Sequence, residues 1–156
     1  MTIGFNHLGR HGRLGNQMFQ YAGLRGIAAH KGYDFAIPPS DFNDEWNDHQ
    51  LFEAFKLTGL TNINEIPGPY VQEAHFHFDQ NLFDNMPDGH NVYAYLQSTK
   101  YFEHIEEEIR EDFEFKNDIH LPCKEMMNTL KDPIALHVRR GDYIQNCDNH
   151  PPCPKE

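Results

Sequence analysis

The order of elements expected over residues 2–37 constrains the fold more than any other feature of this sequence. Residues 2–8 (TIGFNHL) are typical of a short strand, and a glycine-rich stretch over 9–15 follows it. Over 16–31 the apolar residues recur at helical spacing, and Gly32 is placed to end the helix. Residues 33–37 (YDFAI) indicate a second strand. A strand, a helix and a strand in this order predict a parallel sheet in an α/β fold with three layers.

The rest of the chain indicates further strands and helices of the same fold class. The acidic stretch over 40–70 is irregular, and we expect it at the surface with one short helix in DHQLFEAF. Ser98 or Thr99 can cap a helix whose apolar residues form one stripe. The predicted elements are strands at 71–78, 91–97 and 134–138, and helices at 100–115 and 123–130.

Composition argues against several classes of protein. The 156 residues suffice for one domain with a hydrophobic core, and 12 Phe and 7 Tyr supply large rings to bury. A formal net charge of −11 disfavours nucleic acid as a partner. We find no apolar run of membrane-spanning length and no signal peptide, so we expect a cytoplasmic protein without stable membrane insertion, with peripheral membrane association left open. The three cysteines are not spaced as a disulfide framework.

The first motif, GRLGNQMFQYA at 12–22, stands where the first strand turns into the long helix. A helix N-terminus presents unpaired backbone N–H groups, and Gly12 and Gly15 let a ligand approach the backbone closely. Arg13 adds a forked donor, and Asn16 adds an amide that both donates and accepts. The spacing matches neither the nucleotide P-loop nor the dinucleotide fingerprint. The motif indicates a site for a diphosphate or a sugar hydroxyl, and a tight turn with a surface arginine is the alternative.

The second motif, HVRRGDY at 137–143, follows the last predicted strand. Side chains after the carboxyl end of such a strand point into the crevice where open α/β sheets bind ligands. Strand alternation places His137 and Arg139 on one face and Arg140 on the other. One arginine can therefore reach a phosphate. A structural pair between Arg140 and Asp142 is the alternative.

Three stretches of the sequence resemble the α-1,2-fucosyltransferases of glycosyltransferase family 11. They are GRLGNQMFQYA at 12–22, YLQSTKYF at 95–102 and HVRRGDY at 137–143, in the family's order and at about its separations. The resemblance extends from residue 3 to the end. It implies an inverting enzyme of the two-lobed GT-B fold that needs no metal or other cofactor. The implied partners are GDP-β-L-fucose as donor and a glycan acceptor, with L-fucose moved to the 2-hydroxyl of a terminal galactose.

The same resemblance implies catalytic roles for two residues. A reaction that expels GDP needs positive charge on the leaving diphosphate, and where no metal serves, an arginine must supply it. By resemblance this role falls to Arg139, on the β-phosphate. Arg13 and Asn16 are expected to contact the diphosphate and the fucose, so Asn16 joins Arg139 as a predicted catalytic residue.

The remaining motif residues have predicted supporting roles. Gly12 and Gly15 would shape the turn, and His137 would hydrogen-bond donor or acceptor, unless it is a packed strand histidine. Arg140 and Asp142 are expected to pair, and Asp142 as a weak general base is left open. The predicted donor-binding set is Gly12, Arg13, Gly15, Asn16, His137, Arg139, Arg140 and Asp142.

The acceptor side is less specified by the sequence. We interpret YLQSTKYF as a strand end followed by a helix cap, and a role for Gln97 and Ser98 in lining an acceptor cleft is the alternative. Trp46 and Tyr70 can stack on a sugar ring or simply pack in the protein.

Chain length predicts how the molecule divides. Family enzymes are about twice as long, which corresponds to about two domains. We therefore expect an N-terminal fragment or truncated member, with residues 1–133 as the N-terminal α/β lobe. Residues 134–156 would be the first strand and loop of an incomplete donor-binding lobe. The alternative function is a catalytically incomplete fragment that binds a sugar or a nucleotide sugar.

A zinc module is a further alternative. CDNHPPC places Cys147, His150 and Cys153 three residues apart, and Cys123 would be a fourth ligand. Structural zinc sites normally use tighter pairs held by turns, so we prefer a loop with free thiols and predict no metal site.

Overall fold

The computed structural model describes residues 1–40 and 49–138, together with Ile144 and Asp148. Contacts divide the chain into two compact units, Met1–His120 and Leu121–Glu156. The predicted boundary after residue 133 stays a prediction. The first unit holds the sheet and the hydrophobic core.

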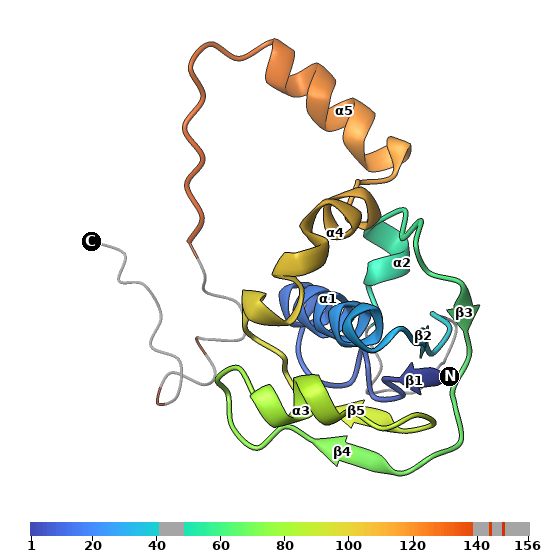
Figure 1. The fold of residues 1–156 in the computed structure, drawn as a ribbon. Coiled ribbons are helices and arrows are strands. Elements are labelled where there is room, and N and C mark those ends of the chain that lie inside the picture. The colour runs from blue at the N-terminus through green and yellow to red at the C-terminus, as the bar shows by residue number, and fades with distance from the viewer. Residues whose placement is uncertain (41–48, 139–143, 145–147, 149–156) are drawn as a thin grey trace. The chain divides into compact units, whose positions relative to one another are not determined.

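A parallel sheet of five strands organises the first unit, in the order β3-β2-β1-β5-β4 (Figure 1). Ile3 of β1 lies opposite Phe35 of β2, and Gly4 lies opposite Asn91 of β5. Because β1 is the central strand, the loop after it leaves from the middle of the carboxyl edge, where α/β sheets bind ligands. The predicted α/β class, with a parallel sheet flanked by helices, is confirmed. The strands are β1 (Thr2–Gly4), β2 (Asp34–Ile37), β3 (Asn62–Ile63), β4 (Tyr70–Gln72) and β5 (Asn91–Tyr93).

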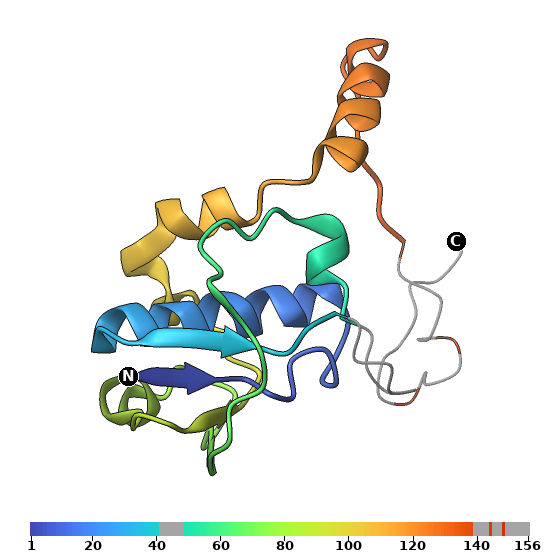
Figure 2. The same ribbon diagram turned by 90° about the vertical axis from the view of Figure 1, so that its right-hand side faces the viewer.

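The long helix α1 (Leu14–Lys31) packs along β1 and β2 (Figures 1 and 2). Its buried side chains include Tyr21, Leu24 and Ile27, which recur at helical spacing. The helix ends at Gly32, whose left-handed backbone, with a φ of 66°, lets its N–H reach carbonyls of the last turn. The predicted helix and its stop are confirmed, and the helix begins two residues earlier than expected.

The strands are shorter than the sequence predicted. β4 ends at Gln72 and β5 ends at Tyr93, so the expected strands over 71–78 and 91–97 are wrong beyond these residues. Between the two strands lies a helix that the sequence analysis did not name, α3 (Gln80–Asn85). The Asp79 carboxylate starts that helix by accepting a hydrogen bond from the N–H of Leu82 at 3.0 Å, and this bond holds its pKa below the usual range. The helix follows the predicted strand over 71–78 and does not replace it, because residues 73–78 form neither strand nor helix.

The helix expected over 100–115 is broken into three pieces. Two 3₁₀ turns, η1 (Thr99–Tyr101) and η2 (Glu103–Ile105), precede α4 (Glu106–Asp112). Tyr101 is fully buried, and its backbone lies against Gly26 of α1. This close approach directs the chain across α1, which explains why no continuous helix starts at Ser98.

A buried carboxylate ties α4 to the rest of the core. Asp112 pairs with Arg25 of α1 and accepts a hydrogen bond from the Tyr21 hydroxyl at 2.5 Å. Two groups of residues 58–59, far earlier in the chain, also donate to it: the Gly59 N–H at 2.6 Å and the Thr58 hydroxyl at 3.2 Å. Because the charge is buried and satisfied on several sides, Asp112 stabilises the packing of three segments.

The strand expected over 134–138 is absent. Ile134 and Leu136 are 94% and 87% exposed, and every described residue from Leu121 onward is exposed. A strand requires a hydrogen-bonded neighbour, and the described strands offer none to these residues. This prediction was therefore wrong. The two remaining helices are α2 (Leu51–Ala54) and α5 (Asn117–Asn128), the second of which contains Pro122 and begins six residues before the predicted helix.

Candidate functional site

The loop after β1 carries the first motif. It leaves the central strand and turns back into α1 (Figure 2). Gly12 has a φ of 91°, and a Cβ on it would overlap the Asn16 side chain, so both the backbone and the space require glycine. Arg13 occupies the N-cap position with extended backbone and is exposed. Gly15 is also exposed, and a Cβ there would meet no atom within 4 Å. The structure thus brings the four predicted residues of this motif together.

Two buried glutamines of α1 hold the loop in place. Gln17 Nε2 donates to the Gly12 carbonyl at 3.3 Å, and Gln17 Oε1 accepts from the backbone N–H of Gln50 at 2.9 Å. Gln20, nearly one turn further on, donates from Nε2 to the His11 carbonyl at 2.9 Å. Both side chains are fully buried, so the loop conformation is tied to the helix. The sequence analysis missed these roles, although two amides on an otherwise apolar helix face were a usable signal.

Asn16 connects the first motif to the middle one. Its Oδ1 accepts a hydrogen bond of 2.8 Å from Gln97 Nε2, across 81 residues of sequence. Its Nδ2 end lies over Gly12. The stretches at 12–22 and 95–102, which the sequence analysis could only place on separate elements, therefore meet at one point on the carboxyl side of the sheet.

Glu73 fixes the segment that carries Gln97. Its Oε2 accepts from the N–H groups of Tyr95 at 3.1 Å and Leu96 at 3.3 Å, and its Oε1 accepts from the Tyr101 hydroxyl at 2.9 Å. Leu96 has a φ of 52°, a conformation that costs a branched side chain free energy and persists only where surrounding contacts hold it. Because its carboxylate is bound by the chain itself, Glu73 positions Gln97, a role that nothing in the sequence indicated.

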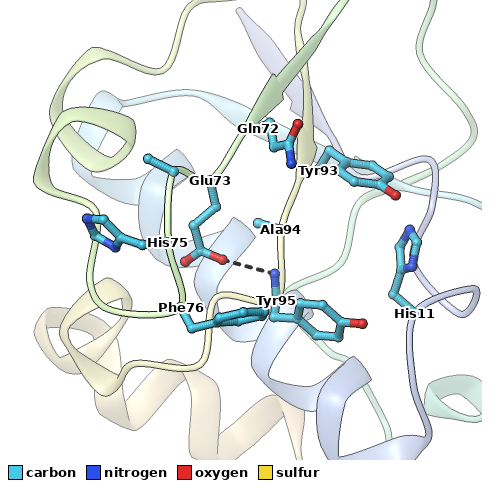
Figure 3. A pocket seen from close by; sticks show the side chains of 9 residues that line it. His11, Gln72, Glu73, His75, Phe76, Tyr93, Ala94 and Tyr95 are labelled. Carbon is cyan, nitrogen blue, oxygen red and sulfur yellow. Dashed lines mark hydrogen bonds between the residues drawn. The ribbon is translucent and has the colours of Figure 1, made fainter.

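A cleft of about 260 Å³ opens beside this segment (Figure 3). The Tyr93 ring lies edge-on to His11, with 4.9 Å between centroids and 85° between planes. The Tyr95 ring lies 5.7 Å from Phe76 and 6.1 Å from His11. None of the described residues that line the cleft is a lysine or an arginine. The cleft is lined by His11, Gln72, Glu73, Ala74, His75, Phe76, Tyr93, Ala94 and Tyr95.

Two further rings continue the aromatic lining toward β1. His7 stacks on His11 at 5.7 Å, and Tyr70 and Tyr93 contact His7 edge-on at 4.9 and 5.3 Å. Burial, with a smaller contribution from the positive charge of Arg10, lowers the pKa of both His7 and His11. Both imidazoles are therefore neutral at pH 7. We name this set the aromatic row; it consists of Tyr70, His7, Tyr93, His11, Tyr95 and Phe76.

The second motif is only partly described. His137 is exposed and belongs to no described strand, and its predicted role in binding donor or acceptor stays a prediction. Arg139, Arg140 and Asp142 lie outside the described residues, as does Trp46. Their predicted roles stay predictions.

The described residues hold no cluster of the kind that the zinc alternative requires. Within residues 1–40 and 49–138, no three His, Cys, Asp or Glu side chains are grouped closely enough to hold a metal ion. Cys123 is exposed and forms no disulfide, while Cys147, His150 and Cys153 are not among the described residues. The helices of the described part are too short or too polar to cross a membrane.

A turn that contains glycines, placed before a helix at the carboxyl edge of a parallel sheet, is typical of α/β proteins that bind a phosphorylated ligand. Here such a turn lies beside a cleft lined by aromatic residues. Comparison with known families narrows this class: residues 2–151 match glycosyl transferase family 11. The chain belongs to this family, as the three motifs predicted.

Individual relatives are similar at low identity. The chain is 25% identical to galactoside alpha-(1,2)-fucosyltransferase 2 of Sus scrofa, over 88% of this chain and 42% of the relative. It is 26% identical to alpha-1,2-colitosyltransferase of Escherichia coli, over 88% of this chain and 54% of the relative. It is 25% identical to galactoside 2-alpha-L-fucosyltransferase SEC1 of Bos taurus, over 86% of this chain and 38% of the relative. The chain thus spans about half the length of these relatives, or less. No solved structure matches it significantly.

Proposed function

We propose that this chain supplies the N-terminal part of an inverting α-1,2-fucosyltransferase. The enzyme would transfer L-fucose from GDP-β-L-fucose to the 2-hydroxyl of a galactoside, without a metal. The observation that carries the proposal is the hydrogen bond of 2.8 Å between Asn16 and Gln97, because it joins two of the three family motifs beside the turn at Gly12. Membership of the glycosyltransferase family supports the reaction class.

The geometry of the loop suits the leaving group of this reaction. As the bond between fucose C1 and the diphosphate breaks, negative charge develops on GDP. Arg13 at the N-cap and the backbone N–H groups of the first turn of α1 offer positive charge and donors for it. Asn16 accepts from Gln97 through Oδ1, which leaves its Nδ2 as the end that donates.

The second motif completes the proposed chemistry. Arg139 would bind the β-phosphate, with Arg140 and His137 nearby in sequence. The new bond forms between fucose C1 and the acceptor oxygen, whose proton must pass to a base as GDP leaves. Asp142 is the carboxylate of the motif that can take this role.

Titration calorimetry tests the donor part of the proposal. The 156-residue chain is titrated with GDP-β-L-fucose and with GDP, in EDTA, and compared with Arg139→Ala. We expect binding without metal, weakened about tenfold or more in the variant, because a charge-assisted contact to phosphate is lost. Arg110→Ala is the matched control, since Arg110 is exposed and pairs with Glu106 within α4. An Arg139→Ala chain that binds GDP as tightly as the unmodified chain would exclude the proposed role of Arg139.

A second candidate is a fragment that binds the donor but does not turn it over. The lengths of the matched relatives favour this candidate for the chain taken alone. Assay of fucose transfer to lactose separates the two candidates. Calorimetric binding without product in that assay would support the second candidate, whereas product would support the first.

A further inference from the structure

The aromatic row is a built surface that the proposed donor chemistry does not use. We propose that it binds the acceptor saccharide, with the terminal sugar ring in the cleft against Tyr93, Tyr95 and His11. This inference rests on the proposed function, because it names the second substrate of the same site. Four properties of the described residues support it: size, chemistry, rigidity and position.

Size indicates a small ligand. The cleft holds about 260 Å³, just below the range of about 300–1,000 Å³ that is usual for pockets of drug-sized ligands. One sugar ring fits such a space. Beyond the cleft the row continues through His7 to the half-exposed Tyr70, which offers further ring surface to the next sugar of a longer acceptor.

The chemistry of the lining favours a neutral sugar over an anion. Ring faces carry negative potential and attract the polarised C–H groups on the apolar face of a pyranose. The Gln72 amide and the His75 imidazole add hydrogen-bonding groups for hydroxyls at the rim. No lysine or arginine is among the described residues that line this cleft, and the Glu73 carboxylate repels negative charge. A diphosphate is therefore disfavoured here and favoured at the neighbouring loop.

The backbone that carries the row is held in place before any ligand binds. Tyr95 is fixed by the hydrogen bond of 3.1 Å from its own N–H to Glu73, drawn as a dashed line in Figure 3. Tyr93 belongs to β5, and the carbonyl of His11 is bound by the buried Gln20. Because this backbone is ordered in advance, less conformational freedom is lost on binding, which favours measurable affinity from weak stacking contacts.

The cleft lies beside the residues proposed to bind the donor. His11 immediately precedes Gly12, and Tyr95 stands two residues before Gln97, which binds Asn16. A saccharide in the cleft would thus contact the same loop and the same segment that carry the proposed donor residues. Transfer requires such closeness, because the acceptor hydroxyl must reach the anomeric carbon.

Nuclear magnetic resonance titration of the full chain with lactose tests the inference. We expect shift changes at the amides of Tyr93 and Tyr95 and a dissociation constant roughly fivefold larger in Tyr95→Leu, since one ring contact is lost. Tyr33→Leu is the matched control, because Tyr33 is half-buried and stands at the opposite end of the strands, just before β2. Phe76→Ser, at a side chain 70% exposed, gives a second variant that leaves the core intact.

Two outcomes would overturn the inference. One is lactose binding that is absent, or equal in the unmodified chain, Tyr95→Leu and Phe76→Ser. The other is GDP binding that is lost in Tyr95→Leu, which would assign the row to the nucleobase. Titration of the same variants with GDP-β-L-fucose keeps the two proposals separate. Unchanged donor binding without lactose binding refutes only the acceptor row, and lactose binding without donor binding refutes only the donor loop.

Discussion

At the scale of single residues, the structure requires a glycine at one of the two glycine positions of the first motif and not at the other. Gly12 has a φ of 91° and no space for a Cβ beside Asn16. Gly15 lies within α1, where a Cβ would meet nothing, so the fold itself does not require a glycine there. A glycine that packing does not need, at an exposed helix start, is available for close approach of a ligand to the backbone.

We therefore expect Gly12→Ala and Gly15→Ala to differ in both stability and binding. Gly12→Ala should cost about 1–3 kcal/mol of unfolding free energy and weaken donor binding, because the backbone is strained and Asn16 must move off Gln97. Gly15→Ala should gain up to about 1 kcal/mol through helix propensity while also weakening binding of GDP-β-L-fucose. Urea denaturation and calorimetry measure the two properties. Unchanged donor binding in Gly15→Ala would show that no ligand approaches this backbone.

Residue roles were predictable only where the sequence itself carries the signal. The turn at 12–16 follows from its glycines and from the helix that starts there, so the sequence placed it correctly. The partners of that turn were not predictable, because Gln97 lies 81 residues from Asn16 in sequence and only the strand order brings them together. Glu73 was missed for the same reason: its hydrogen bonds join β4 to the segment after β5.

At the scale of elements, the packing of α1 against η1 depends on one close contact. A Cβ on Gly26 would lie 2.8 Å from the carbonyl carbon of Tyr101 and 2.9 Å from Cα of Phe102, both backbone atoms that cannot rotate away. The η1 turn follows directly on the segment that carries Gln97. A shift of η1 away from Gly26 would therefore also move the segment that positions Gln97 in the candidate site.

Gly26→Ala should destabilise the protein by about 1–2 kcal/mol. Overpacking costs about 1–3 kcal/mol, and the better helix propensity of alanine offsets up to about 1 kcal/mol of it. Gly15→Ala is the control, since it makes the same chemical change in the same helix where nothing is displaced. Urea unfolding compares the variants. A Gly26→Ala protein as stable as Gly15→Ala would mean that the η1 backbone yields without cost.

Elements with a strong local signal were predicted, and elements decided by distant contacts were not. The helix at 14–31 has a sustained apolar face and a glycine stop, and both are observed. The continuous helix over 100–115 was wrong because the approach of η1 to Gly26 breaks it, a contact invisible in local periodicity. The strand over 134–138 was wrong because an apolar run becomes a strand only beside a pairing partner.

At the scale of the whole molecule, buried histidines make stability depend on pH. His49 is 5% exposed, neither of its ring nitrogens is hydrogen-bonded to another described residue, and burial lowers its pKa to about 4 from 6.5. Between these two pH values the unfolded chain binds a proton that the folded chain excludes. The unfolding free energy is therefore fully retained above pH 6.5 and falls as the pH drops toward 4, by about 3 kcal/mol in total for this group. His7 and His11 act in the same direction.

Replacement of His49 isolates its contribution. His49→Leu should leave the protein at least as stable at pH 7, because it removes two buried nitrogens that have no hydrogen-bond partner among the described residues, and should flatten the loss of stability below pH 6.5. His77→Leu, at an exposed histidine, is the control. Urea unfolding from pH 7 to pH 4.5 measures the slopes. Parallel curves for His49→Leu and the unmodified chain would contradict the assignment.

The strand order also has a consequence for how the chain acquires its structure. β1 comes first along the chain among the described strands and is the central strand of the sheet, yet one of its two neighbours is β5, which begins at Asn91. No two strands of the described sheet are joined by a tight hairpin, because all of its pairings are parallel. Loop closure over long sequence distances must precede each pairing, which makes folding slow. During synthesis, the edge of β1 that pairs with β5 has no partner until the chain has been extended past Asn91, which is more than half of these 156 residues.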